Sequence, residues 1–311
     1  MPHPQISPGV YWAKDRTVTT ADGARIAFRV LRDDDLPPGP TVALLSGFLC
    51  PDTWWHHLTP QLVAAGYRVV MLHYRGIATS TAPEWPDDRS MTVERYAEDV
   101  LDVLHAAGVH EVNLIGHSMG GQVMVEVARR IPDRVTSMTS ITGAYRSPTR
   151  GMYGQGWLIE PAMTQLIRLL RPLRGQMGTA VWRTVWRTVP FLPLGRAATA
   201  FSARTPDDIV ASYEAHAVTL TGEYFIAALE AMHRHDPGDV LGDLDVPTLV
   251  ISGDTDPFTP RAVAEEMVEG LPQAELLVVP DTSHGAILEE PEVVGDAVLT
   301  HLAKATGHLP A

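Results

Sequence analysis

A serine in a Gly-x-Ser-x-Gly pattern is the first residue of this sequence that could do chemistry. Ser118 lies between Gly116 and Gly120, after an apolar run typical of a strand (112–117) and before a helical pattern (122–131). A sharp turn from strand to helix leaves no room for side chains two residues on either side of the serine, and glycine removes them. The turn is expected to push the Ser118 hydroxyl out at the positive end of the helix, where an oxyanion is stabilised.

A hydroxyl is a weak nucleophile until a base removes its proton, and the chain offers a base further on. His284 follows the apolar run 274–280, and Asp254 and Asp256 follow the run 247–251. An aspartate orients the imidazole of such a base and stabilises its cation. The chain order is therefore serine, aspartate, histidine, with either aspartate available as the third member.

These residues need a scaffold, and the apolar runs predict one. Short runs typical of strands buried on both faces occupy 41–48, 67–74, 112–118, 135–142, 247–254 and 274–281. Between two of them, Val93, Tyr96, Ala97, Val100, Leu101 and Leu104 fall on one face of a helix. A hairpin is expected near the N-terminus, around an Asp-Gly turn at 21–24. Strands alternating with helices predict an α/β fold with a mostly parallel sheet covered on both sides.

The alternation stops near residue 146 and resumes near 237. Between these positions apolar residues recur at helical spacing, and Thr205–Asp208 is typical of a helix start. The two recurring sets are Met163, Leu166, Ile167, Leu170 and Trp182, Val185, Trp186, Val189. We therefore expect a core domain made of 1–145 and 237–311, and an inserted helical cap, or lid, made of 146–236.

From about residue 17 to 305 the sequence resembles the α/β-hydrolase superfamily, in the branch with a GHSMGG turn and a helical cap. The resemblance implies the α/β-hydrolase fold, with Ser118 as nucleophile and His284 as base. In the family pattern G-x-x-D the last residue is the triad acid, which here is Asp256. Asp254 remains the rival for that role.

The resemblance also implies an oxyanion hole made of two backbone N–H groups. One is that of Met119, after the nucleophile, and the other comes from the loop after the strand 41–45, where Phe48 is the expected donor. The family usually has His-Gly where this chain has Ser46-Gly47, and many relatives have an aspartate where it has His73.

The implied activity is that of a serine hydrolase that cleaves a carboxylic ester through an acyl-enzyme. The substrate is expected to be a hydrophobic small-molecule ester, a lactone or a thioester, and no cofactor or metal is needed. Carbon–carbon bond hydrolysis, acyl transfer or perhydrolysis on the same triad is the alternative, and a non-catalytic ligand receptor is a distant one. A serine nucleophile disfavours the epoxide hydrolases and haloalkane dehalogenases of the superfamily, which use an aspartate there.

The start of the expected cap should supply substrate contacts, because it directly follows a strand end near the site. Methionine and aromatic residues there suggest an apolar pocket for a medium to large substrate, although core packing explains them equally well. The residues expected to line the pocket are Leu49, Tyr145, Met152, Tyr153 and Trp157.

Composition limits the class of protein. The 311 residues carry a net charge of −13, which argues against a nucleic-acid partner. Cys50 is the single cysteine and cannot pair within the chain, so we expect a buried, inert thiol in a reducing setting. No apolar run approaches the ~18 residues of a transmembrane helix, and the N-terminal segment lacks the apolar stretch of a signal peptide. A cytoplasmic protein is expected.

The expected cap has its own charge. Nine arginines and one acidic residue, Glu160, lie between Arg146 and Arg204, a net charge of +8 that leaves −21 on the remainder. With Trp157, Trp182 and Trp186, this segment could contact anionic lipid, a coenzyme A group or an acidic carrier protein. Ion pairing with the acidic body and packing of the tryptophans is the favoured interpretation. His56-His57 and His233-x-His235 lack zinc-site partners and are interpreted as surface or lid-base residues.

Overall fold

The computed structural model describes residues 13–34, 39–82, 90–173, 176–189, 191–197 and 201–308. Residues 1–12, which hold most of the segment considered as a signal peptide, and Arg174 of the arginine-rich segment lie outside this set. Among the described helices, none combines the length and apolarity that crossing a bilayer requires.

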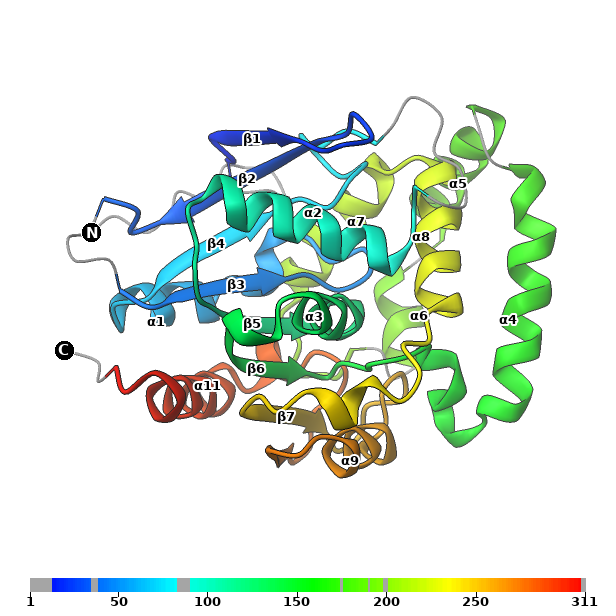
Figure 1. Cartoon of the computed structure of the whole chain (residues 1–311). Coiled ribbons are helices and arrows are strands. Elements are labelled where there is room, and N and C mark those ends of the chain that lie inside the picture. The colour runs from blue at the N-terminus through cyan, green and yellow to red at the C-terminus, as the bar shows by residue number, and fades with distance from the viewer. Residues whose placement is uncertain are drawn as a thin grey trace.

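Eight strands form one sheet in the described part of the chain. Figure 1 shows how the labelled strands lie side by side in this sheet. Its order is β1-β2-β4-β3-β5-β6-β7-β8. The pairs β1–β2 and β2–β4 are antiparallel, and every other neighbouring pair is parallel. The strands are β1 (Arg16–Thr19), β2 (Arg25–Leu31), β3 (Thr41–Leu45), β4 (Arg68–Leu72), β5 (Val112–His117), β6 (Val135–Ile141), β7 (Thr248–Gly253) and β8 (Ala274–Val279). The predicted hairpin and mostly parallel sheet are confirmed.

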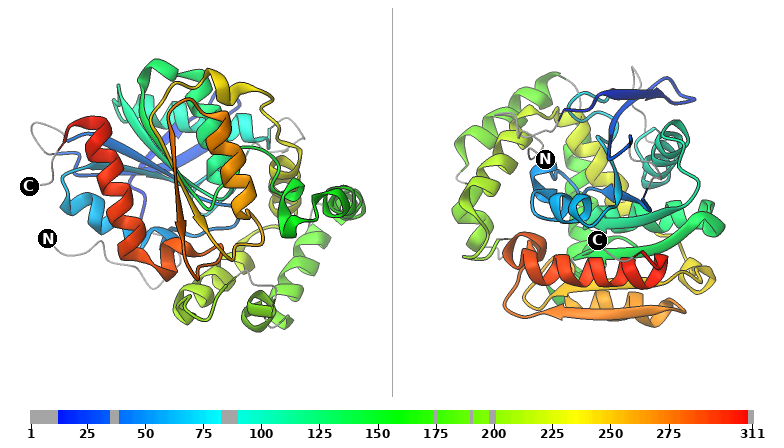
Figure 2. Two further views of the ribbon diagram at one scale, coloured as in Figure 1. Left: turned by 90° about the horizontal axis from the view of Figure 1, so that it is seen from below. Right: turned by 90° about the vertical axis from the view of Figure 1, so that its left-hand side faces the viewer.

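Helices cover both faces of the sheet, which is why its inner strands read as continuous apolar runs. Ala43 and Leu45 belong to a core cluster with residues of α2 (Val93–Ala106), α3 (Met119–Arg130) and α9 (Arg261–Gly270). Val42 and Leu44 alternate to the other face and pack with α1 (Leu58–Ala64) and α11 (Pro291–Thr306). Figure 2 shows these two helical layers on either side of the twisted sheet.

The connection from β6 to β7 is helical, as the spacing of its apolar residues predicts. It contains α4 (Gly156–Leu170), α5 (Gln176–Thr188), α6 (Phe191–Ala197), α7 (Asp207–Thr219) and α8 (Gly222–Arg234), and short α10 (Ala286–Glu289) follows β8. In Figure 1 the helices α4 to α8 lie beyond the carboxyl ends of the parallel strands, with α4 on the outer side of α8. In parallel α/β sheets this edge is where ligands bind.

Candidate active site

Ser118 lies in the turn between β5 and α3, in a backbone conformation that side chains rarely adopt. Its φ and ψ angles are 51° and −120°. Two glycines make this turn possible, because a Cβ at Gly116 would lie 2.4 Å from the carbonyl oxygen of Gly120. A Cβ at Gly120 would lie 2.0 Å from the carbonyl oxygen of Leu45. The glycine spacing therefore follows from close backbone packing, and it holds Ser118 at the N-terminus of α3.

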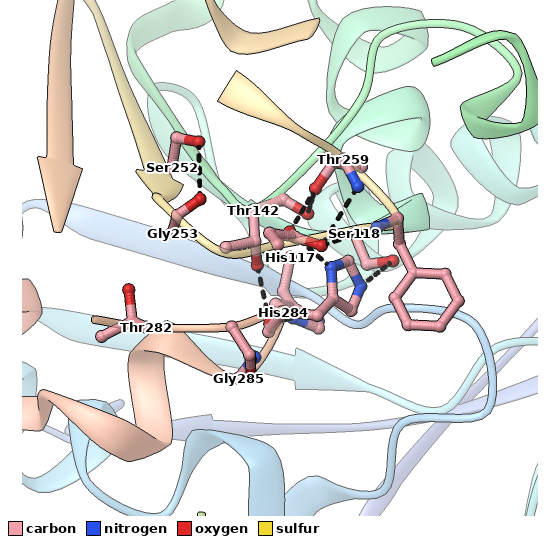
Figure 3. Close-up of polar contacts among 12 residues, drawn as sticks. His117, Ser118, Thr142, Ser252, Gly253, Thr259, Thr282, His284 and Gly285 are labelled. Carbon is pink, nitrogen blue, oxygen red and sulfur yellow. Dashed lines mark hydrogen bonds and ion pairs between the residues drawn. The ribbon is translucent and has the colours of Figure 1, made fainter. Parts of the chain in front are cut away.

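The structure brings Ser118, His284 and Asp256 together from three separate loops. Figure 3 shows the His284 ring beside Ser118. His284 Nδ1 lies 2.8 Å from Asp256 Oδ2, and His284 Nε2 lies 2.9 Å from Ser118 Oγ. An ionised Asp256 can only accept hydrogen bonds, so Nδ1 carries the imidazole proton and donates it. The Nε2 lone pair is then free to accept the Ser118 hydroxyl proton, which is the geometry of an activated serine.

Asp256 is held as a carboxylate although it is buried. Burial opposes its ionisation, but the neighbouring His284 and several hydrogen bonds outweigh this effect and lower its pKa. Its Oδ1 accepts from the backbone N–H groups of Phe258 (2.8 Å) and Thr259 (3.2 Å). Its Oδ2 accepts from the Thr259 hydroxyl at 2.6 Å as well as from His284.

Asp254 points elsewhere. It is exposed, and its Oδ1 accepts from the backbone N–H of Thr282 at 3.2 Å. It therefore braces the loop that carries His284 without contacting the imidazole. Of the two aspartates that follow β7, only Asp256 reaches His284.

The loop after β3 lies against the serine. A Cβ at Gly47 would lie 2.9 Å from Ser118 Cβ and 2.7 Å from His117 Nδ1. Phe48, the next residue, lines the same cavity as Ser118 and His284. Met119 is buried at the first position of α3, directly after the serine. Both residues expected to supply oxyanion donors therefore lie near Ser118, because Met119 follows it in the chain and Phe48 lines the same cavity.

His117 is a site residue that the sequence analysis missed. It is fully buried, and burial and the neighbouring His284 lower its pKa to about 3, so it is neutral. Trp54 Nε1 donates to His117 Nε2 at 3.0 Å, which leaves the ring proton on Nδ1. That nitrogen lies 3.7 Å from Cys50 Sγ in the loop after β3. The signal in the sequence was its position next to Ser118.

A buried carboxylate supports the His284 loop and was also missed. Glu289 accepts from the backbone N–H of Ser283 at 2.7 Å and from its hydroxyl at 2.5 Å. It also accepts from Thr205 Oγ1 at 2.5 Å and from the Ser202 backbone N–H at 3.2 Å. Although burial opposes its ionisation, these hydrogen bonds lower the pKa of Glu289. One carboxylate thus ties the loop before α7 to the residue next to His284.

A cavity of about 470 Å³ opens onto Ser118 and His284. Its described lining is apolar and aromatic and includes no lysine, arginine, aspartate or glutamate. Besides Ser118, Thr259 and His284, the lining residues are Phe48, Cys50, Trp54, Pro148, Thr149, Met152, Met163, Trp186, Leu194, Gly195, Phe201, Tyr213, Leu229, Met232 and Phe258.

The pocket prediction needs correction at four of its five positions, because only Met152 lines this cavity. Leu49, in the loop after β3, is buried in the core, and the Tyr145 hydroxyl donates to Glu266 at 2.8 Å. Tyr153 is 46% exposed, with its ring centroid 6.1 Å from that of Phe258, and Trp157 is 80% exposed at the start of α4.

The remaining sequence candidates have ordinary partners. His233 lies 3.0 Å from Thr149 Oγ1 and 2.9 Å from Thr164 Oγ1 through its two ring nitrogens. Burial raises the pKa of the Cys50 thiol, which keeps it protonated. His73 lies 3.0 Å from buried Asp52, which also binds Lys14 at 2.7 Å.

One group of possible metal ligands occurs in the described residues. Donor atoms of Glu94, Glu126 and His235 lie within 4.8 Å of one another. Glu126 already binds the guanidinium groups of Arg129 and Arg130, so its charge is compensated without an ion.

Comparison with known proteins places this chain in a family. The model of the alpha/beta hydrolase fold matches residues 40–291. A 2-hydroxy-6-oxononadienedioate/2-hydroxy-6-oxononatrienedioate hydrolase of Klebsiella pneumoniae is 28% identical, over 94% of this chain and 97% of its own. The hydrolase of the same name from Escherichia coli O81 is 30% identical, over 85% of this chain and 88% of its own.

Solved structures share the fold at lower identity. An esterase from Exiguobacterium antarcticum superposes with a TM-score of 0.74 at 20% identity, over 92% of this chain and 98% of its own. The enol-lactonase from Burkholderia xenovorans LB400 superposes with a TM-score of 0.70 at 22% identity, over 93% of this chain and 100% of its own.

Proposed function

Because this chain belongs to the α/β-hydrolase fold family and its relatives are named hydrolases, we propose that it is a serine hydrolase acting on an uncharged carboxylic ester with a hydrophobic acyl group. The observation that carries the proposal is the continuous chain of hydrogen bonds from Asp256 through His284 to Ser118, at the mouth of an apolar cavity.

The mechanism follows from the proton positions. His284 Nε2 takes the Ser118 proton while Ser118 Oγ attacks the acyl carbon, and the negative charge moves to the carbonyl oxygen. The backbone N–H groups of Phe48 and Met119 stabilise that oxygen, aided by the positive end of α3. His284 then gives its proton to the leaving alcohol, and later activates the water that hydrolyses the acyl-enzyme. Asp256 stabilises the imidazolium in both halves of the reaction.

The cavity lining supports an uncharged substrate. Its described walls are mostly methionine, leucine and aromatic side chains, and no lysine or arginine is among them. A charged acyl group would lose its hydration there without gaining a counter-ion, and an uncompensated buried charge is costly. An alkyl or aryl acyl chain gains roughly 0.8 kcal/mol for each methylene that it buries.

Carbon–carbon bond hydrolysis on the same residues is the second candidate, because the Klebsiella and Escherichia relatives carry that kind of name. The substrates in those names are dicarboxylates, which need cationic partners when they bind. The described cavity offers none, and for this reason we rank ester hydrolysis first.

The test is hydrolysis of p-nitrophenyl esters of increasing acyl length by the wild type and Ser118→Ala. We expect the wild type to prefer medium acyl chains, and the variant to lose on the order of 10⁴-fold or more in kcat. Asp254→Asn is the matched control, since its side chain does not touch His284. Turnover of a 2-hydroxy-6-oxo dienedioate but of no ester would move the assignment to carbon–carbon hydrolysis. A folded wild type that binds esters without turning them over would favour the receptor alternative.

A further inference from the structure

Large apolar side chains are exposed on one part of the molecule. Ten large hydrophobic residues are exposed in the described chain, and nine of them lie between Tyr153 and Leu194, on or next to α4, α5 and α6. Trp157 is 80% exposed and Leu169 is 75% exposed. The others in this stretch are Tyr153, Leu158, Leu166, Val181, Val185, Val189 and Leu194. Such clustering on a folded chain marks an interaction surface.

The same helices are basic. Residues 161–206 contain seven arginines and neither aspartate nor glutamate, in a chain whose net charge is −13. Three of these arginines, Arg168, Arg183 and Arg187, are exposed and form no salt bridge within the described residues. Arg171, Arg196 and Arg204 bind Glu230, Asp207 and Glu290 respectively. We call the exposed apolar residues together with Arg168, Arg183 and Arg187 the basic apolar face.

This face is continuous with the cavity at Ser118. Met163 of α4, Trp186 of α5 and Leu194 of α6 line the cavity wall, while other residues of the same helices are exposed. In Figure 1 α4 lies on the outer side of α8, away from the sheet. The same three helices therefore form both the exposed apolar surface and part of the cavity wall.

From these observations we propose that the basic apolar face docks on the surface of a membrane rich in anionic lipid. The arginines pair with the lipid phosphates and the tryptophan and leucine side chains enter the headgroup region, as in amphipathic interfacial helices. The proposal extends the function proposed above, since it places the entrance of the site at the source of apolar esters. The docking itself does not depend on catalysis.

A second copy of this chain is the other obvious occupant, and charge disfavours it. A twofold dimer would place the same patch on both partners, so the unpaired arginines of the two copies would face one another. Like charges opposed at a desolvated interface are destabilising. Anionic phosphate groups supply the opposite charge.

The experiment is flotation of the full chain with vesicles of phosphatidylcholine alone, or of phosphatidylcholine mixed with phosphatidylglycerol. We expect the wild type to float with the anionic vesicles at low salt and to be released as salt increases. Each arginine near an anionic surface strengthens binding about fivefold. Arg183→Gln/Arg187→Gln should therefore lower vesicle affinity about 25-fold. The control Arg25→Gln/Arg261→Gln, with the same change in net charge, should match the wild type.

A second pair of variants tests the exposed apolar residues of the basic apolar face. Leu169→Ser should lower affinity roughly tenfold, whereas Val293→Ser, at an exposed apolar residue outside the face, should have no effect. Ser118→Ala should bind vesicles as the wild type does, which separates failure of docking from failure of the proposed hydrolysis. The proposal is overturned if the wild type ignores anionic vesicles, or if the two arginine pairs weaken binding equally. It is also overturned if sedimentation shows a dimer that Leu169→Ser dissociates.

Discussion

The close contact of Gly47 with the active serine gives the sharpest test of the proposed oxyanion hole. A methyl group at this position would lie 2.7 Å from His117 Nδ1, 2.9 Å from Ser118 Cβ and 3.0 Å from Cys50 Sγ. Ordinary contacts begin near 3.4 Å, so Gly47→Ala must move the loop by roughly 0.7 Å to clear His117, the residue before the serine. Ser118 cannot yield instead, because Gly116 and Gly120 hold its turn against β3.

That displacement is enough to remove one donor. A hydrogen bond from the Phe48 N–H of about 2.9 Å would lengthen to about 3.6 Å, which is no longer a hydrogen bond. Losing one oxyanion donor costs about 3 kcal/mol in the transition state, or 10²- to 10³-fold in kcat. We therefore expect Gly47→Ala to lower kcat by that factor. KM should change little, because the donor acts mainly on the developing oxyanion.

The assay is steady-state hydrolysis of p-nitrophenyl butyrate, with thermal unfolding measured on the same samples. Gly242→Ala is the matched control, since a Cβ there meets no atom within 4 Å. The strain of the added methyl group should cost Gly47→Ala about 1–3 kcal/mol of stability, which leaves a folded protein at 25 °C. If Gly47→Ala is folded and its kcat lies within threefold of that of Gly242→Ala, the placement of the oxyanion hole is wrong.

Three further predictions follow from buried carboxylates. Asp256→Asn should lower kcat about 10⁴-fold, because the amide favours the wrong tautomer of His284. The kcat of Asp254→Asn should stay within a few-fold of that of the wild type. Equal losses of kcat in the two variants, measured in steady-state assays, would contradict the assignment of Asp256 as the acid. Burial opposes the ionisation of Glu126, but hydrogen bonds from His235, Arg129 and Arg130 outweigh it and lower its pKa to about 2 from an ordinary 4.5, which stabilises the folded state above pH 5. Because this stabilisation is lost as pH falls through the folded pKa, urea unfolding between pH 5 and 2 should show a shallower decline in Glu126→Gln; parallel curves would argue against it. Glu289→Gln should lower the free energy of unfolding, measured in urea, by about 1–3 kcal/mol, because the amide N–H group would face the N–H and O–H donors of Ser283. The variant should also have a lower kcat, because the loop that carries His284 is held less firmly. Glu292→Gln, at an exposed residue, is the control for this variant. Unfolding curves that are the same for Glu289→Gln and Glu292→Gln would show that Glu289 does not brace the His284 loop.

The sheet and the serine turn were predictable because local patterns determine both. A parallel strand buried on two faces must be continuously apolar, and the turn at Ser118 excludes any residue but glycine at two positions. The positions of His284 and the two aspartates, directly after strands, were readable for the same reason. Parallel strands end at one edge of the sheet, so residues that follow them are brought together.

The cavity wall was not predictable, because it depends on which way each helix face turns. Trp157 and Met163 both belong to α4, six residues apart, and at about 100° per residue their side chains lie roughly 120° apart around the axis. Met163 lines the cavity and Trp157 is in solvent. Apolar spacing predicts the helix but cannot choose between two apolar faces when one packs inward and the other is exposed.

The choice between the two aspartates after β7 shows how a turn separates residues that a strand would align. In an extended chain Asp254 and Asp256 would point to the same side of the sheet. Here the backbone N–H of Asp256 donates to the carbonyl oxygen of Gly253 at 3.3 Å, so the chain turns between them. The turn sends Asp254 to the backbone of Thr282 and buries Asp256 among four donors. Three of those donors come from the loop itself, so the carboxylate is desolvated and oriented before it meets the imidazole. The hydrogen bond to His284 is then made without reorganisation, as electrostatic stabilisation of an imidazolium requires.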